Sequence, residues 1–365
     1  MFVKKLRNYI VCAAVSLSAL WSTSASAEYA LNLTKGVTPI SREVYDLHMI
    51  ILYVVTAIGV AVFAVMFWSI LHHRKSKGAV AAQFHHSTVA ELTWTIIPVL
   101  ILVVMAIPAT KTLIKMEETT SPDMTIKVTG YQWKWKYDYM DEDISFFSSL
   151  NEESNKIRKG ESETNVMDHE NYLLDVDNHV VVPVKKKIRI LTTAADVIHA
   201  WWVPALGWKR DAIPGFINDN WTYIEEPGIY RGQCAELCGR DHGFMPIVVE
   251  AVTEPEYLAW VEKMKTQPVE INPEKLYATH CSTCHQANGQ GLPGAFPALA
   301  GSPIAIGPAA AHIDIVLNGK PGTAMLAYGP QLSNEELAAI ITYERNAWGN
   351  DVGDVVTPED VQAAR

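Results

Sequence analysis

The residues that decide the fold are Cys234-Ala-Glu-Leu-Cys238-Gly-Arg-Asp-His242-Gly-Phe-Met245. Two thiols, an imidazole and a thioether lie within these twelve positions, and His199 lies upstream in Asp-Val-Ile-His-Ala-Trp-Trp-Val-Pro. Soft thiolates beside imidazoles and a weak thioether are ligands that copper selects. The alternative is a structural disulfide between the two cysteines, which would persist in an exported protein. A disulfide does not require a histidine and a methionine a few residues after the cysteines, so the pattern favours copper.

A second cysteine pair lies in Cys281-Ser-Thr-Cys284-His285, the spacing that attaches a c-type haem covalently. We expect the two cysteines to anchor the haem and His285 to be one axial ligand of its iron. The alternative is a thioredoxin-like Cys-x-x-Cys site, but no βαβ pattern surrounds the motif and a histidine follows it directly. Two redox centres on one polypeptide indicate an electron conduit.

The start of the chain is predicted to export and anchor it. Residues 1–27 combine a basic start, a short apolar run and Ala-x-Ala, which predicts a secretory signal peptide cut after its last residue. In the next segment, residues 28–119, two apolar runs at 47–71 and 92–114 are each long enough to cross a bilayer. The basic connection at 72–77 places the loop between them in the cytoplasm and the later residues outside. A hairpin buried in a globular domain is the alternative, and the length of the apolar runs disfavours it.

In residues 120–254 the pattern changes to short strands. Segments rich in β-branched residues and bounded by turn formers lie at 124–129, 178–184, 187–192 and 246–252. Several such strands predict an all-β Greek-key domain, either a sandwich or a barrel. The polar, mostly acidic insert at 141–170 can bury little surface, so we expect a mobile surface loop or a contact for another subunit.

The last third of the chain is predicted to be helical. A helix and a proline-punctuated linker occupy residues 255–272, and a domain at 273–350 is followed by a tail at 351–365. Asn272-Pro273 has the form of a cap followed by the first helical residue. The last helix of the domain begins with the capping box Ser333-Asn-Glu-Glu336, and Leu337, Ile340, Ile341 and Trp348 are expected to share one of its faces. These features indicate an all-α domain around the haem motif.

The quoted motifs carry a family resemblance. Residues 232–247 resemble the binuclear copper loop of cytochrome c oxidase subunit II, and Asp211-Ala-Ile-Pro-Gly215 resembles a second stretch of that subunit. The resemblance covers most of the chain up to about residue 254. It implies a two-helix transmembrane hairpin and an all-β, cupredoxin-like domain. The region from residue 273 resembles a class I cytochrome c, so the chain is similar to the variety of subunit II with a cytochrome c fused at its C-terminus.

The resemblance also implies a ligand set for two coppers. The residues that would hold them are His199, Cys234, Glu236, Cys238, His242 and Met245. The two cysteines would bridge both metals, and each histidine would ligate one. The methionine would be the weak ligand of one copper, and the backbone carbonyl of Glu236 would complete the other. In the family the side chain matching Glu236 also reaches a magnesium at the interface with subunit I, and carboxylate oxygen suits that hard cation. An ordinary loop glutamate is the alternative.

Three further roles follow from the resemblance. In the family, electrons enter at the residue that matches Trp133, although Tyr131 stands where many relatives have histidine, and aromatic packing in a sheet is the alternative. Glu91 matches a glutamate at the mouth of a proton path into subunit I, while the capping box Thr88-Val-Ala-Glu91 at its helix start is the plain alternative. Met325 matches the methionine that is the sixth ligand of the haem iron. His312 is a second candidate, because the proline that usually follows this methionine is absent.

The implied function is that of subunit II in a bacterial inner-membrane haem-copper oxidase. Electrons would pass from a cytochrome c or bc complex through haem c and the copper pair to subunit I, where oxygen is reduced to water with proton translocation. Subunit III would be a further partner. The net charge of −10 is compatible with steering a basic donor, and no nucleic-acid partner is expected.

Three other functions share some of these sequence features. A quinol oxidase subunit II shares the membrane hairpin but lacks the copper thiolates, so Cys234 and Cys238 argue against it. The copper-pair subunit of a nitric oxide reductase would show similar motifs, and its partner subunit and gaseous substrate would distinguish it. A tethered periplasmic electron carrier without an enzyme partner would not need Glu91 or Glu236.

Overall fold

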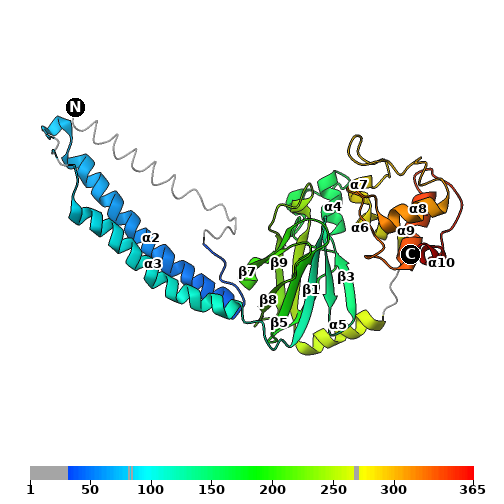
Figure 1. Cartoon of the computed structure of the whole chain (residues 1–365), viewed down its shortest axis with the longest axis horizontal. Helices are drawn as coiled ribbons and strands as arrows, with labels where there is room; N and C mark the ends of the chain where they lie inside the picture. The colour runs from blue at the N-terminus through cyan, green and yellow to red at the C-terminus, as the bar shows by residue number, and fades with distance from the viewer. Residues whose placement is uncertain (1–31, 81–82, 84, 267–270) are drawn as a thin grey trace. The chain divides into compact units, whose positions relative to one another are not determined.

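The structure is a computed structural model that describes residues 32–80, 83, 85–266 and 271–365 (Figure 1). The predicted signal peptide at 1–27 lies outside the described residues. The chain divides into two compact units, one ending at Val261 and the other running from Glu262 to Arg365. The first unit holds a helical hairpin and a β domain, and the second is helical.

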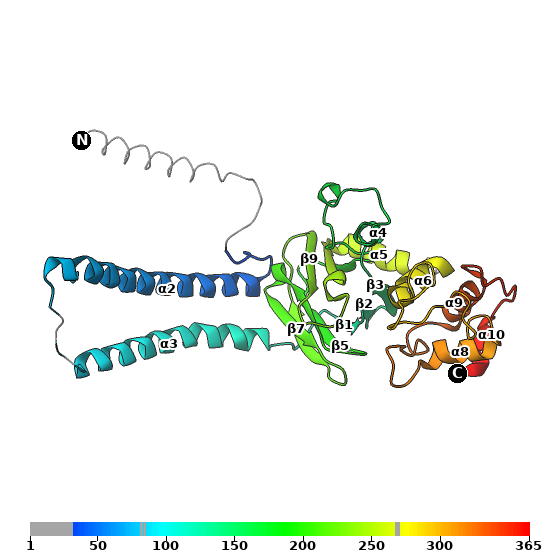
Figure 2. The same cartoon turned by 90° about the horizontal axis from the view of Figure 1, so that it is seen from above.

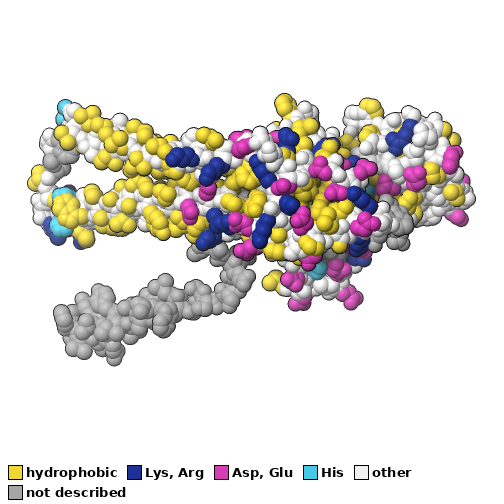
Figure 3. Space-filling view, turned by 90° about the horizontal axis from the view of Figure 1, so that it is seen from below, with side chains coloured by type: hydrophobic (Ala, Val, Ile, Leu, Met, Phe, Trp, Pro, Cys, Tyr) yellow, Lys and Arg dark blue, Asp and Glu magenta, His cyan; other side chains and the backbone are white. Residues whose placement is uncertain are grey.

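Two long helices, α2 (Pro39–His72) and α3 (Thr88–Met116), lie side by side in both ribbon views (Figures 1 and 2). Their most apolar stretches have mean hydropathies of 2.7 and 2.3, and none of the residues in these stretches is buried. Apolar side chains cover the outside of both helices (Figure 3). Helices of this length and composition can cross a bilayer, whose acyl chains would cover these side chains.

The start of α2 is fixed by its cap and by the β domain. The Thr38 hydroxyl accepts a hydrogen bond from the backbone N–H of Ser41 and donates one to the carbonyl of Leu206. Pro39 occupies the first helical position, where its missing N–H costs nothing. The helix therefore begins well before the apolar run predicted at 47–71.

The β domain is a sandwich of two five-stranded sheets. One sheet has the order β3-β2-β1-β5-β8 and the other the order β4-β10-β9-β6-β7. The strands are β1 (Met124–Tyr131), β2 (Lys134–Tyr139), β3 (Ile144–Ser148), β4 (Val180–Pro183), β5 (Ile188–Ala194), β6 (His199–Val203), β7 (Trp208–Ala212), β8 (Asn218–Thr222), β9 (Gly228–Cys234) and β10 (Pro246–Val252). The β1–β5 and β4–β10 pairs are parallel and the other neighbours antiparallel. In β5, alternate residues are buried, as expected for a strand with one face in the core.

The insert at 141–170 is more ordered than its composition predicts. It contains helix α4 (Glu152–Lys159), which Asn151 caps by accepting from the N–H groups of two first-turn residues. Ser154 and Ile157 of this helix are buried, while Glu152 and Lys156 are exposed. Helix α5 (Glu254–Thr266) follows β10, and its Trp260 ring packs 5.1 Å from that of Tyr139.

The second unit is built from five helices among its described residues. They are α6 (Pro273–His280), α7 (Ser282–His285), α8 (Ala309–Asn318), α9 (Asn334–Asn346) and α10 (Pro358–Ala364). The predicted caps are confirmed: Asn272 caps α6 with Pro273 at the first position, and Ser333 and Glu336 form a capping box on α9. Leu337 of α9 is fully buried.

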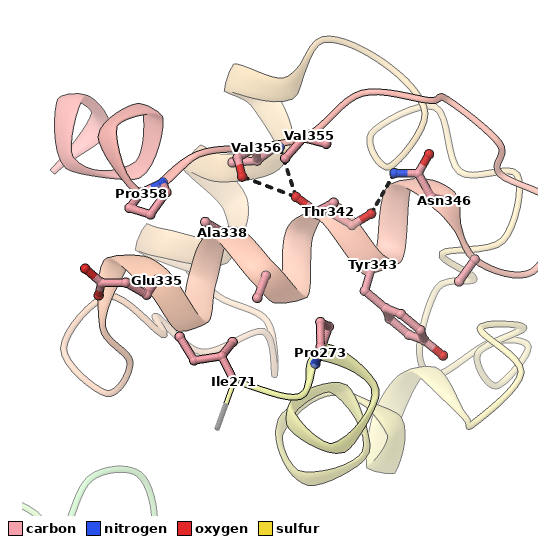
Figure 4. Close-up of a pocket in the computed structure, with 12 residues that line it drawn as sticks. Ile271, Pro273, Glu335, Ala338, Thr342, Tyr343, Asn346, Val355, Val356 and Pro358 are labelled. Carbon is pink, nitrogen blue, oxygen red and sulfur yellow. Dashed lines mark hydrogen bonds between the residues drawn. The ribbon is translucent and has the colours of Figure 1, made fainter. Parts of the chain in front are cut away.

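The tail after α9 folds back along that helix (Figure 4). The Thr342 hydroxyl accepts a hydrogen bond from the N–H of Val356 at 2.9 Å and lies 3.3 Å from its carbonyl. Asn346 donates to the Thr342 carbonyl at 2.8 Å. Together with Val361, which is buried on α10, these contacts make the predicted tail at 351–365 part of the helical unit.

Candidate functional site

The first half of the candidate metal centre lies where β6 and β9 pair. Strand β9 ends at Cys234, and β6 begins at His199. The Sγ atoms of Cys234 and Cys238 lie 3.8 Å apart, and the two cysteines form no disulfide. His199 directs Nδ1 at the Cys234 sulfur from 3.9 Å. These three ligand atoms lie within 4.8 Å of one another, and all three residues are buried.

The loop after β9 completes the cluster. The Cys238 sulfur lies 3.5 Å from Nδ1 of His242 and 3.5 Å from Sδ of Met245. The backbone carbonyl of Glu236 lies 3.4 Å from the Cys234 sulfur, while its side chain is exposed. The structure thus brings together all six residues that the sequence suggested for the metals. Two thiol sulfurs between two imidazole nitrogens form a soft donor set that fits copper.

Asp196 is a part of the site that sequence reasoning missed. Its carboxylate lies 2.9 Å from Nε2 of His199 and also accepts the backbone N–H of Gln132 at 2.7 Å. A carboxylate behind a histidine fixes the ring and leaves the other nitrogen for a metal. Burial disfavours the charged imidazole, but the hydrogen bonds to Asp196 and Cys234 outweigh it and raise the pKa of His199. The only signal in the sequence was an aspartate three residues before a suspected ligand.

Of the two thiol protons, one is easily lost and the other is held tightly between the sulfurs. The hydrogen bond from Cys238 lowers the pKa of Cys234 to about 3, against the opposing effect of burial, with further help from His199. The same contact with the Cys234 thiolate, together with burial, raises the pKa of Cys238 far above its ordinary value. Thiolates are the form that binds metal. One thiolate is therefore ready, and metal binding would displace the remaining proton.

Side chains from β2 and from the turn between β1 and β2 border the cluster. The Trp133 indole N–H donates to the Cys238 carbonyl at 3.2 Å, and the Gln132 amide donates to the same oxygen at 2.8 Å. Trp135 is fully buried, donates to the Met245 carbonyl at 3.2 Å and packs edge-on to the His199 ring at 5.8 Å. Trp133 therefore contacts the backbone of a candidate ligand directly.

Glu91 lies at the start of α3, apart from the copper cluster in sequence and in secondary structure. The N-cap is Ser87 rather than Thr88, and Ser87 donates its backbone N–H to the Glu91 carboxylate at 3.3 Å. The capping alternative is thus visible in the structure, one residue earlier than the sequence motif suggested.

The second unit contains a cavity of about 340 Å³ beside the Cys-x-x-Cys-His motif. Its walls include Cys281, Cys284, His285, His312 and Met325. The ring nitrogen Nδ1 of His285 bonds to the backbone carbonyl of Pro297 at 2.9 Å, which leaves Nε2 for another partner. Two thiols for covalent attachment, an imidazole with one nitrogen available and a thioether in the wall of the same cavity fit a c-type haem.

His312, the second candidate for the sixth iron ligand, is engaged by another residue. It is almost completely buried, and its Nε2 lies 2.8 Å from the carboxylate of Glu344. Its Nδ1 has no hydrogen-bond partner among the described residues. Met325 is half-buried on the cavity wall, and its main chain is held by contacts with Thr323 and Lys320.

Comparison with known families gives three matches along the chain. The transmembrane domain of cytochrome c oxidase subunit II matches residues 26–112, and the periplasmic domain of that subunit matches residues 124–252. The family described as cytochrome c oxidase, cbb3-type, subunit III matches residues 271–343. Both long helices, the β sandwich and the haem motif are thus covered.

Individual relatives agree with these matches. The chain is 40% identical over 238 residues to a probable cytochrome c oxidase subunit 2 of Rickettsia felis, covering 65% of this chain and 73% of the relative. It is 38% identical to the corresponding protein of Rickettsia bellii, covering 68% and 88%. Among solved structures, the periplasmic domain of subunit II of cytochrome oxidase of Bradyrhizobium japonicum is 44% identical, with a TM-score of 0.35 and coverage of 40% of this chain and 96% of that domain.

Proposed function

We propose that this chain carries electrons from an external donor to subunit I of a haem-copper oxidase. The proposal starts from its family, because the chain belongs to the cytochrome c oxidase subunit II family. Two membrane helices anchor it, its β domain is the copper-site domain of the family, and a cytochrome c domain is fused behind it. When bound, a copper pair and a haem c would supply one-electron transfer.

The observation that carries this proposal is the convergence of four further donors on two thiols that are 3.8 Å apart and form no disulfide. We propose that the side chains of Cys234, Cys238, His199 and His242 would hold the two coppers. Met245 and the Glu236 carbonyl would complete the set. In the second unit, Cys281, Cys284, His285 and Met325 would hold the haem.

The protein around the metals would keep them dry and rigid. His199, Cys234, Cys238 and Met245 are buried, and Asp196 orients the first of them. A buried, preformed ligand set changes little when one electron arrives, which suits transfer rather than bond chemistry. We propose Trp133 as the residue where electrons enter, because its indole bonds to the Cys238 carbonyl.

The finer biological setting is also a proposal. The basic connection at 72–77 between the helices supports a cytoplasmic loop, with both redox domains on the periplasmic side of a bacterial inner membrane. Subunit I would reduce oxygen to water with proton translocation, with subunit III beside it and a cytochrome c or bc complex as donor. The exposed Glu236 side chain could reach a magnesium ion shared with subunit I, and Glu91 would lie at the mouth of a proton path.

Replacing one thiol tests the proposal. In the full chain, Cys234→Ser or Cys238→Ser should abolish the mixed-valence copper spectrum, because each change removes a proposed ligand. The haem c spectrum should remain. The reciprocal control, Cys281→Ser with Cys284→Ser, should lose covalent haem and keep the copper spectrum. A copper spectrum like that of the unchanged chain in either single variant would refute the assignment.

A further inference from the structure

A residue of the polar insert contacts the turn that carries two of the proposed copper ligands. Arg158 lies in α4, 83 positions before Asp241 in the sequence. Its Nη2 lies 3.3 Å from the Asp241 carboxylate, and the two side chains are only 16% and 6% exposed. The same guanidinium lies over the ring of Phe244, with its central carbon 4.2 Å from the ring centre.

These two contacts enclose the turn that carries His242. The N–H of Phe244 donates to the Asp241 carbonyl at 2.9 Å, so both residues belong to one tight turn, and Met245 follows it directly. The residue between His242 and Phe244 is Gly243, and a Cβ placed there would meet nothing within 4 Å. A glycine in open space does not restrict the backbone by itself. The backbone of the turn is closed by its own hydrogen bonds, which also include the His242 N–H to the Gly239 carbonyl at 3.3 Å, and Arg158 adds side-chain contacts from another element.

Arg158 is itself held in place. Its Nε donates to the Asn155 side chain at 2.8 Å, one turn earlier in α4. The helix is anchored by buried Ser154, whose hydroxyl lies 3.0 Å from Nε2 of His169, and by buried Ile157. A guanidinium can bond to a carboxylate at its edge while its flat face covers an aromatic ring, which an ammonium group does less well.

We propose that Arg158 is a positioning residue for the copper centre. It would hold the turn at 241–244 so that His242 and Met245 face the thiols before any metal binds. This inference rests on the copper site proposed above and adds to it a residue from outside the copper loop. Residues that orient ligands in this way typically change metal affinity by about 10- to 100-fold when they are removed.

The test compares three variants of the full chain in detergent. Arg158→Ala removes both contacts, and Arg158→Lys keeps the charge without the planar fork. Lys156→Ala is the matched control, because Lys156 lies on the same helix, is 47% exposed and pairs only with the exposed Glu152 in the ion pairs of the described residues. Copper dissociation is measured by competition with a chelator, and hydrogen exchange at 239–245 is measured on the metal-free chain.

We expect Arg158→Ala to weaken copper retention by about 10- to 100-fold and to speed exchange in the turn. Its copper hyperfine pattern should also change. Arg158→Lys should fall between this variant and the unchanged chain, and Lys156→Ala should match the unchanged chain. Wild-type copper retention and exchange in Arg158→Ala would overturn the proposal, as would an equal loss in Lys156→Ala.

A second variant and the exchange rates of the metal-free chain test the proposal if Arg158→Ala does not fold or if no copper binds. If Arg158→Ala fails to fold, Asp241→Asn removes the ion pair with Arg158, together with the one that Asp241 forms with Arg240 at 3.1 Å, and leaves the contact of Arg158 with Phe244. It should change copper retention and exchange in the same direction as Arg158→Ala. No change in Asp241→Asn would then count against the proposal. If the unchanged chain shows no copper-pair spectrum, the proposed function fails, while the exchange rates of the metal-free chain still decide whether Arg158 orders the turn.

Discussion

Replacing Asp196 with asparagine tests how strongly the surroundings hold a metal ligand. The carboxylate lies 2.9 Å from Nε2 of His199, and the two side chains are 4% and 0% exposed. Asparagine preserves the shape and removes the charge, and a hydrogen bond to a charged group is worth about 1.5–3 kcal/mol. Since about 1.4 kcal/mol corresponds to a factor of ten, Asp196→Asn should raise the copper dissociation constant by roughly 10- to 100-fold.

The same substitution should shift the pH dependence. The pKa of metal-free His199 is raised above its usual 6.5. Protonation of His199 therefore stabilises the folded metal-free chain below the unfolded pKa, and this contribution is lost as pH rises through the raised folded pKa. Copper must displace that proton. Copper retention should strengthen as pH rises through this window, and in Asp196→Asn the window should move to lower pH.

The assay is chelator competition on the full chain at several pH values, with the copper spectrum as readout. Asp138→Asn is the control, because this half-buried carboxylate of β2 pairs with Lys136 at 3.3 Å and has no hydrogen bond or ion pair with a proposed copper ligand among the described residues. Equal copper retention and an unmoved pH profile in Asp196→Asn would refute the reasoning, since they would show that the carboxylate neither orients His199 nor stabilises its protonated form.

Three other changes give separate predictions. Met325→Ala should lower the haem midpoint potential and allow added imidazole to bind the iron; a redox titration that shows no change would point to another sixth ligand. Trp133→Phe removes the N–H bonded to the Cys238 carbonyl and should slow electron transfer into the copper centre after flash reduction, and an unchanged rate would place the point of electron uptake elsewhere. Leu337 is fully buried in α9, so Leu337→Ala should destabilise the helical unit by about 2–5 kcal/mol while the copper spectrum persists. Haem absorbance in increasing denaturant measures this loss, and an unchanged free energy of unfolding would contradict the burial of Leu337.

The parts of the fold that sequence could predict are those with local signals. Two long apolar runs, a Cys-x-x-Cys-His motif and the caps at Asn272 and Ser333 each depend on residues a few positions apart. Strands β1, β4, β5 and β10 were visible as β-branched segments. Strands β6 to β9 were not, because β6 is rich in tryptophan and β8 in asparagine, and neither alternates clearly between apolar and polar residues.

The insert at 141–170 shows why composition alone misled the prediction. Its charge pattern is that of a solvated loop, yet α4 places its small polar and apolar residues inward and its charged pair of Glu152 and Lys156 outward. The position of Trp348 also differs from the prediction. It was expected on the face of the last helix of the haem domain, but it follows α9 in a left-handed backbone conformation and packs 4.7 Å from Tyr277.

The candidate metal site also has a part that local sequence patterns predict and a part that they do not. Its proposed ligands could be found because five of the six lie within twelve positions, where spacing alone carries the signal. The residues that orient them come from other segments: Asp196 precedes β6, Trp133 joins β1 to β2, and Arg158 lies in the insert. A spacing pattern cannot specify such partners, because only the fold brings them to the loop. Substitutions in the copper loop and outside it should therefore have different effects. Loss of a thiol should abolish the copper spectrum, because it removes a ligand. Loss of Asp196 or Arg158 should weaken copper retention and leave a recognisable copper-pair spectrum, because all the ligands remain.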